Sequence, residues 1–303
     1  NKTTYNGNYG LNAQWTVYNG SKRLKTIEQE KLNNRVANLD VATSENDIEQ
    51  SIAQVYIQIL YAAESVKVNE NTLQVSEAQR DRGKQLLDAG SIARSDYAQL
   101  EAQVSTDRYQ LVTAQATLQD YKLQLKQLLE LDGEQEMQVY LPALGDENVL
   151  SPLPTKTDVF RSAVALRPEI EASKLSVEAS ELGIGIAKSG YLPSVSLTAG
   201  IGTNHTSGSD FTFGEQVKNG WNNSIGLSIS VPIFNNRQTK SAVEKAKLQY
   251  QTSQLTLLDE QKTLYKTIEG LWLDANSAQQ RYAAAIEKLH STQTSYEIGR
   301  AHV

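Results

Sequence analysis

The 303-residue chain contains no cysteine and only six prolines. Without cysteine, a protein cannot form disulfides, bind zinc through thiolates or use a cysteine nucleophile. No run of about 18 apolar residues occurs, so the sequence predicts no transmembrane helix. The chain opens on the polar segment Asn1–Thr4, in which no signal peptide is visible. These absences exclude several classes of protein without fixing a compartment.

Charge and histidine content exclude further classes. The formal net charge of −6 and the lack of a long basic run argue against nucleic-acid binding. The three histidines, His205, His290 and His302, are far apart and show no metal-binding or catalytic spacing. Carboxylates are plentiful, but no pair is marked as catalytic. The sequence therefore predicts no catalytic residue, metal or cofactor, and a protein that is not an enzyme.

Three short segments alternate between apolar and polar residues, as strands with one apolar face do. Residues 202–223, between the second and third segments, are rich in Gly, Asn, Ser and Thr and predict a long loop. Alternation alone fits either a membrane barrel or a soluble sandwich with one buried face. The apolar members are Tyr9, Leu11, Ala13, Trp15 and Val17; Val195, Leu197, Ala199 and Ile201; and Ile225, Leu227, Ile229, Val231 and Ile233.

Longer segments carry mostly apolar residues at every seventh position, which is typical of coiled-coil-like helix packing. We expect residues 21–88 and 237–297 each to form one long helix, because proline does not interrupt either segment. A helix over residues 21–88 would be roughly 100 Å long, so it must run beside other long helices. The seven-residue positions are Ile27, Asn34, Val41, Ile48, Val55 and Ala62; Tyr97, Val104, Leu111, Leu118 and Leu125; and Val243, Tyr250, Leu257, Leu264, Leu271, Ala278 and Ala285.

The chain also repeats itself with a shift of about 216 residues. The shift places the strand-to-helix junction at residues 17–19 on residues 233–235, and its register continues without a gap for some 65 residues. In this register, the first-copy equivalents of residues 159–203 would precede residue 1, and the counterpart of Gly90 would follow the last residue. We therefore expect a chain truncated at both ends. We also expect the tail 298–303, which leaves the apolar seam, to be non-native.

Four segments, taken in order, resemble motifs of the TolC family of outer-membrane efflux proteins. The resemblance covers nearly the whole chain, and its main departure is Asn236, where the family usually has glycine. The segments are Ala89–Gln103 (AGSIARSDYAQLEAQ), which resembles the periplasmic tip turn, Leu166–Ile170 (LRPEI), the start of a lead-in helix, Ala187–Leu197 (AKSGYLPSVSL), a helix-to-strand junction, and Ser230–Asn236 (SVPIFNN), a strand exit.

The resemblance implies a mainly α fold with a small β part. Each chain of a homotrimer would give long antiparallel, coiled-coil-like helices to an α-barrel and strands to a transmembrane β-barrel in the outer membrane. Most of the chain would then lie in the periplasm. The implied division assigns residues 1–20 and 191–235 to the β-barrel, residues 21–131, 159–190 and 236–297 to periplasmic helices, and residues 132–158 to a middle region.

The same resemblance makes the turn at Gly90, Ser91, Arg94 and Asp96 the tip at which partners dock. Gly90 suits a left-handed helix end, and Ser91 is able to cap the helix that follows. In relatives the matching tip aspartate helps to hold the mouth closed or to select cations, so Asp96 is the candidate gate residue. The alternative for Asp96 is a first-turn acid that the helix dipole favours.

Trp15 and Tyr18 are candidates for an aromatic belt at the membrane interface, with ordinary strand composition as the alternative. The resemblance implies an outer-membrane channel of a tripartite efflux or type I secretion system. Such a channel is a passive conduit that works with a periplasmic adaptor and an inner-membrane pump. The second hypothesis is a soluble periplasmic coiled-coil adaptor or structural stalk, in which the apolar faces of the strands would have no lipid to meet.

Overall fold

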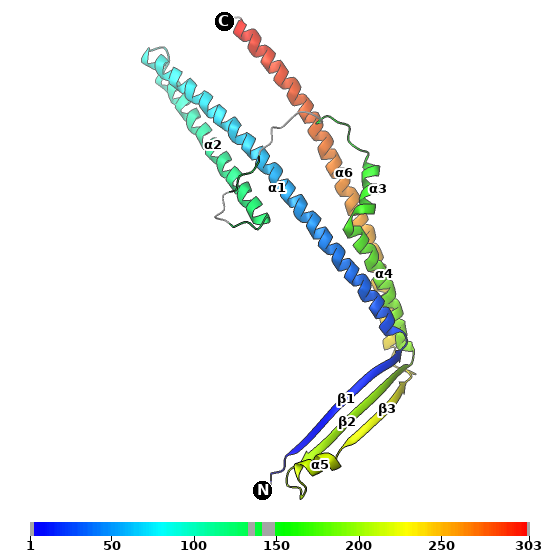
Figure 1. The fold of residues 1–303 in the computed structure, drawn as a ribbon. Helices are drawn as coiled ribbons and strands as arrows, with labels where there is room; N and C mark the ends of the chain where they lie inside the picture. The colour runs from blue at the N-terminus through cyan, green and yellow to red at the C-terminus, as the bar shows by residue number, and fades with distance from the viewer. Residues whose placement is uncertain (1–2, 133–136, 141–148, 302–303) are drawn as a thin grey trace. The chain divides into compact units, whose positions relative to one another are not determined.

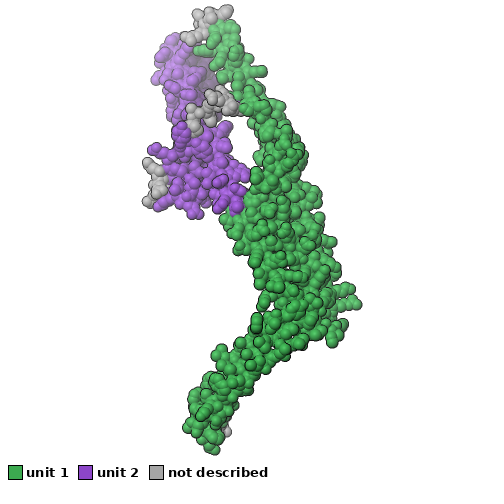
Figure 2. Space-filling model, turned by 45° about the vertical axis from the view of Figure 1, so that its right-hand side comes forward, with its two compact units in different colours: residues 1–41, 150–303 green, residues 42–149 purple. Residues whose placement is uncertain are grey.

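The computed structural model describes residues 3–132, 137–140 and 149–301. The chain divides into two compact units, one made of residues 1–41 and 150–303 and the other of residues 42–149 (Figure 2). Each unit is described by itself. In the described part of the chain, no helix combines the length and the apolar character needed to cross a membrane.

The first unit contains an antiparallel sheet in the order β1-β2-β3, built from β1 (Asn6–Asn19), β2 (Ser194–Thr206) and β3 (Asn222–Ser230) (Figure 1). All three strands that the alternation predicted are therefore present, but the third ends at Ser230, so Val231 and Ile233, which were predicted to belong to it, lie beyond the strand. The long loop predicted over residues 202–223 is wrong in part. Strand β2 continues to Thr206, because its pairing with β1 extends to Asn6, and helix α5 (Phe213–Asn219) occupies much of the remainder.

Helices α3 (Lys156–Leu166), α4 (Pro168–Lys188) and α6 (Gln238–Ala301) also belong to this unit, together with the 3₁₀ turn Ser189–Tyr191. Residues 159–190 were assigned to helix, and the structure divides them at Arg167 into α3 and α4; α4 begins at Pro168, inside the segment Leu166–Ile170 that resembled the start of a lead-in helix. Arg167 is extended, with φ −75° and ψ 125°. The cause is Pro168, whose ring disfavours helical geometry in the residue before it but suits the first position of a helix.

The segment formed by α3 and α4 packs antiparallel along α6. The hydroxyls of Ser180 and Ser253 are 2.8 Å apart, and the indole Nε1 of Trp272 donates to the carbonyl oxygen of Pro154 at 3.0 Å. Between these contacts lie the edge-on rings of Phe160 and Tyr265 and an ion pair of 2.9 Å between Lys156 and Glu269. Ile170 and Leu175 of α4 are buried. The predicted lateral packing of the helices is thus present within this unit.

Helix α1 (Lys22–Asp88) runs unbroken for 67 residues and passes from the first unit into the second. Helix α6 has 64 residues. Both predictions of one long helix are confirmed, for residues 21–88 and for residues 237–297. Only residues 302–303 of the predicted non-native tail lie outside the described residues, and α6 continues through residue 301.

The two strand-to-helix junctions share an uncommon backbone geometry. Gly20 and Ser21 have φ values of 66° and 63°, and Asn236 and Arg237 have values of 49° and 61°. These pairs coincide under the 216-residue shift, so the repeat extends to the backbone. Asn236 replaces the family's glycine in a left-handed position, and asparagine is among the residues that tolerate it best.

The second unit is a helical hairpin formed by the later part of α1 and by α2 (Arg94–Leu128). Arg108 and Glu77 form an ion pair of 2.9 Å between the two helices. Helices α1 and α2 approach closely at Gly83, where an added Cβ would lie 2.3 Å from Cδ1 of Leu100. Residues 133–136 and 141–148 of the predicted middle region lie outside the described residues, and residues 156–158 begin α3.

Candidate functional site

The sheet carries its apolar side chains on one face, because strand pairing keeps the three alternating patterns in register. Ala13 lies opposite Ala199, which lies opposite Ile225, and Trp15, Leu197 and Leu227 form the next row. The remaining rows on this face are Leu11 with Ile201, and Tyr18 with Val195 and Ile229. A one-residue slip in either pairing would move a whole strand's apolar set to the other face.

This apolar face is exposed. Trp15 is 60% exposed, Leu227 66% and Ile225 85%. In a soluble sandwich these side chains would be covered by a second sheet. No second sheet lies on this face among residues 3–132, 137–140 and 149–301.

The opposite face of the sheet is polar and small. Gly10 pairs with Gly202, and Thr198 donates its hydroxyl to the carbonyl oxygen of Gly226 at 3.2 Å. Side chains of this composition can contact water without loss of hydrogen bonds. The residues of the polar face are Asn8, Gly10, Asn12, Gln14 and Thr16 on β1, Ser196, Thr198, Gly200, Gly202 and Asn204 on β2, and Asn222, Ser224, Gly226 and Ser228 on β3.

A β-bulge at Val17 changes which aromatic side chain belongs to the apolar face. The pairing register of β1 shifts between Thr16 and Tyr18, which leaves Val17 as the extra residue. Strict alternation would have placed Val17 on the apolar face. The bulge places Tyr18 opposite Val195 instead, one row from Trp15. The two candidate belt residues thus share a face near the helical end of the sheet.

At the predicted tip, α1 ends in a Schellman turn. The N–H of Ser91 donates to the carbonyl oxygen of Leu86 at 2.7 Å, and the N–H of Gly90 donates to that of Leu87 at 2.9 Å. Gly90 has φ 72°, which confirms the predicted left-handed helix end. An added Cβ at Gly90 would meet nothing within 4 Å, so its requirement for glycine is purely conformational.

The next helix begins differently from the prediction. Ala93, not Ser91, is the N-cap residue of α2, because the Schellman turn still engages Ser91 and two more residues are needed to redirect the chain. The cap is supplied from within the helix. The carboxylate of Asp96 accepts from the N–H of Ala93 at 3.3 Å. The first-turn role considered for Asp96 is therefore present, and Ser91, Arg94 and Asp96 are all exposed around one turn.

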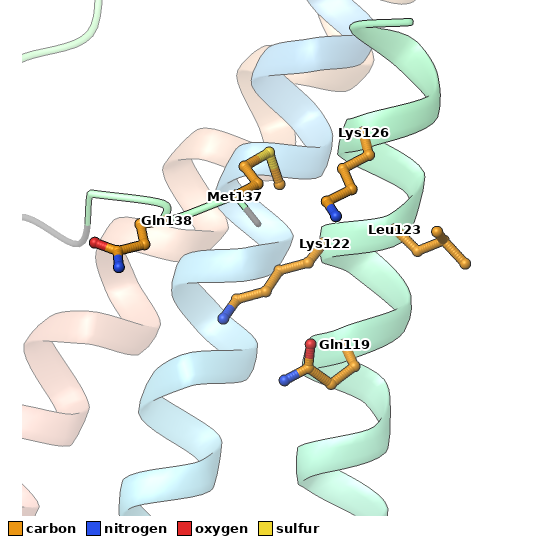
Figure 3. A pocket seen from close by; sticks show the side chains of 6 residues that line it. All are labelled: Gln119, Lys122, Leu123, Lys126, Met137 and Gln138. Atoms are coloured by element: carbon orange, nitrogen blue, oxygen red, sulfur yellow. The ribbon is translucent and has the colours of Figure 1, made fainter. Parts of the chain in front are cut away.

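A pocket of about 560 Å³ lies elsewhere in the second unit (Figure 3). Lys122 and Lys126, one turn apart on α2, line it with Met137 and Gln138. It contains none of the residues that the sequence singled out. Among the residues that the structure describes, no cluster of three or more histidine or acidic side chains could hold a metal ion.

Sequence reasoning missed two features of the site. The first is the bulge at Val17, which depends on pairing with a distant strand and leaves no local signal. The second is α5, whose start carries a capping box between Thr212 and Glu215. Its Thr-x-x-Glu spacing was visible in the sequence.

Comparison with known proteins gives a consistent result. Residues 159–303 match the family model described as outer membrane efflux protein. The chain is 24% identical over 309 residues to the outer membrane protein TolC of Escherichia coli K12, covering 95% of this chain and 60% of TolC. It is 27% identical over 308 residues to the cation efflux system protein CusC of the same organism, covering 98% of this chain and 65% of CusC. The chain thus spans somewhat less than two thirds of these relatives.

Solved structures agree on the fold. The crystal structure of CusC superposes with a TM-score of 0.74 at 20% identity, over 98% of this chain and 73% of CusC. The outer membrane protein VceC of Vibrio cholerae gives a TM-score of 0.73 at 17% identity, over 92% and 71% of the two chains. The family model matches the second half of the chain, and the solved structures match its fold: residues 159–303 resemble the outer membrane efflux protein family, and the chain folds like CusC and VceC.

Proposed function

We propose that the full-length protein is an outer-membrane channel, a passive conduit for solutes that an inner-membrane pump exports. The observation that carries the proposal is the sheet, whose register places one exposed apolar face opposite one polar face. Strands cross lipid only in a closed barrel, where every backbone group is paired. In such a barrel, the face of Ile225 meets lipid and the face of Ser224 lines water.

The energetics favour lipid over water on the apolar face. Seven aliphatic side chains lie there, and complete burial of one contributes about 1.5–3 kcal/mol. Because neighbouring side chains already cover them in part, transfer from water to lipid should stabilise each by roughly 1 kcal/mol, or by about 7 kcal/mol per chain. A soluble adaptor or stalk would forgo this stabilisation. The seven are Leu11, Val195, Leu197, Ile201, Ile225, Leu227 and Ile229.

The proposed assembly is a homotrimer. Strands β1 and β3 each have one neighbour in the described sheet, so each presents an open edge. Open edges are incompatible with the hydrocarbon layer. Closure therefore requires further strands, from the remainder of the full-length chain and from symmetry-related copies. Residues 1–20 and 191–235 would supply barrel strands, with the helical segments in the periplasm.

The partners proposed for the helical end are a periplasmic adaptor and the inner-membrane pump of a tripartite efflux or type I secretion system. The turn at Gly90, Ser91, Arg94 and Asp96 is the proposed docking and gating site. In a three-fold assembly, Asp96 would be presented three times around one opening, and a ring of carboxylates attracts cations. No catalytic step, cofactor or metal is part of this proposal.

Two lysine substitutions test the membrane assignment. Ile225 and Ser224 are neighbours on β3 but face opposite sides of the sheet. A lysine on the lipid face near the middle of the bilayer costs about 2–4 kcal/mol, whereas a lysine in the lumen is tolerated. In full-length protein, Ile225→Lys should deplete trimer from the outer-membrane fraction, and Ser224→Lys should leave it near the wild-type amount.

Native mass spectrometry of the detergent-extracted protein should report three chains. A wild-type protein that stays monodisperse and monomeric without detergent would refute the channel and favour the soluble stalk. Equal depletion by the two lysine variants would contradict the assignment of the two faces.

A further inference from the structure

Helix α5 lies at the end of the sheet where β2 and β3 are joined (Figure 1). The ring of Phe213 lies edge-on to His205 at 5.0 Å and to Tyr9 at 6.4 Å between centroids. The hydroxyl of Thr203 donates to the carbonyl oxygen of Val217 at 2.9 Å. Tyr9, Thr203 and His205 alternate in register with the apolar residues of β1 and β2, so α5 covers the far end of that face.

Hydrogen bonds and one close contact hold the loop that contains α5 in place on the sheet. Glu215 accepts from the N–H and the hydroxyl of Thr212 at 2.9 and 2.8 Å, which fixes the start of the helix. Gln216 ties the helix to the sheet, because its Oε1 accepts from the N–H of Thr206 at 2.9 Å. At the other end, a Cβ on Gly220 would lie 2.5 Å from Oδ1 of Asn204, so the chain returns to β3 in close contact with β2.

This end of the sheet presents large aromatic side chains to the surroundings. Phe211 is 61% exposed, and Phe213 and Trp221 are each 55% exposed. Charged side chains of α5, Glu215 and Lys218, are exposed beside them. Aromatic rings next to charged groups are typical of the border between acyl chains and headgroups, where one part of the surface is apolar and the other hydrated.

The position of this cluster along the sheet fits the thickness of a bilayer. Tyr9 and Tyr18 both lie on the apolar face of β1. Because of the bulge at Val17, their partners on β2, Thr203 and Val195, are only eight residues apart, so the two rows are about 26 Å apart along the strand at 3.2–3.4 Å per residue. With a strand tilt of 35–45°, that separation spans about 20 Å along the membrane normal, comparable with the apolar band of about 25 Å seen in outer-membrane barrels.

We propose that α5 is an interfacial helix that rests in the headgroup layer of the membrane, on the outside of the barrel. Phe213 and Trp221 lie at the border with the acyl chains, and Glu215 and Lys218 lie among the headgroups. The inference rests on the proposed outer-membrane location. It adds a lipid-binding role to a segment that would otherwise be a connecting loop, and it sets the boundary of the apolar face opposite Trp15 and Tyr18.

Depth-dependent quenching by brominated lipids tests the proposal. The full-length protein is reconstituted into phosphatidylcholine vesicles with bromine placed either near the headgroups or near the bilayer centre. Each variant keeps one tryptophan, and the other native tryptophans, among Trp15, Trp221 and Trp272, are replaced by phenylalanine. The reporters are native Trp221 and Phe213→Trp. Ile225→Trp is the matched control for the middle of the apolar face, and native Trp272 on α6 is the control outside lipid.

We expect Trp221 and Phe213→Trp to be quenched at least twofold more by shallow than by deep bromine. Ile225→Trp should show the reverse order, and Trp272 should not be quenched. The inference is overturned if Ile225→Trp is quenched while Trp221 and Phe213→Trp behave like Trp272. If those reporters are also shielded from aqueous acrylamide, a protein surface covers α5 instead. Loss of quenching at Ile225→Trp as well would refute the membrane location itself.

Discussion

The two Schellman turns of the helical hairpin allow a paired test of backbone strain at the proposed tip. After α1, the left-handed position is Gly90, with φ 72°. After α2, the same position is Glu130, with φ 51°, and the N–H of Leu131 donates to the carbonyl oxygen of Lys126 at 3.0 Å. One motif therefore has its preferred glycine, and the other carries a residue with a side chain.

The stability change expected for Gly90→Ala follows from backbone conformation alone. A left-handed residue with a Cβ costs about 1–2 kcal/mol. Because an added Cβ at Gly90 would meet no atom within 4 Å, no clash adds to that cost. Alanine loses less conformational entropy on folding than glycine does, which offsets roughly 0.4–1 kcal/mol of that cost. Gly90→Ala should thus destabilise its turn by about 1 kcal/mol, and Glu130→Gly should stabilise its own by a similar amount.

Hydrogen exchange measured by mass spectrometry reads each turn separately, because local opening governs exchange there. A change of about 1 kcal/mol corresponds to roughly a fivefold change in the opening equilibrium. Peptides around Gly90 should exchange about fivefold faster in Gly90→Ala. Peptides around Glu130 should exchange about fivefold slower in Glu130→Gly. Changes of the same sign in both variants, or no change in either, would refute the strain argument.

Three further predictions concern the gate and α5. Asp96→Ala in the full-length protein should raise single-channel conductance and weaken cation preference; a capping role alone would cost only about 1 kcal/mol of helix stability, with both properties unchanged. Thr212→Ala removes the cap of α5, which costs about 1 kcal/mol of helix stability, and should speed tryptic cleavage at Lys218 roughly fivefold. The control Thr256→Ala on α6 should leave that cleavage rate unchanged, and equal rates in the two variants would contradict the role of the cap. Hydrogen bonds from the backbone and hydroxyl of Thr212 lower the pKa of Glu215, so its contribution to α5 is present above the ordinary carboxyl pKa and is lost as pH falls through the lowered value. The fluorescence of Trp221 should change over that acid range in the wild type and should not change in Glu215→Ala. Identical pH titrations of the two proteins would contradict the role of Glu215.

Sequence periodicity predicted the large elements because they are long. The seven-residue repeat fixed the two long helices to within one residue at their starts, and alternation identified all three strands. Periodicity did not indicate the break at Arg167, whereas the segment Leu166–Ile170, which contains Pro168, resembled the start of a helix. In that case the local preference of the residue before proline prevailed over periodicity.

Short and pairing-dependent features were harder to predict. Helix α5 has only seven residues, too few for a periodic pattern, and its capping box is its only local signal. The bulge at Val17 arises from pairing with β2, nearly 180 residues away in the sequence. At the tip, the left-handed Gly90 was predicted from chemistry alone. The cap by Asp96 in place of Ser91 depends on how far the Schellman turn extends.

If the full-length protein is the trimeric channel proposed above, it should conduct ions across a membrane. Recording from planar lipid bilayers tests it most directly, with detergent-purified trimer added to one side. Wild-type protein should give discrete, reproducible current steps, and Asp96→Ala should give larger and less cation-selective steps. Bilayers that contain inserted trimer of both proteins and never show a current step would contradict the channel.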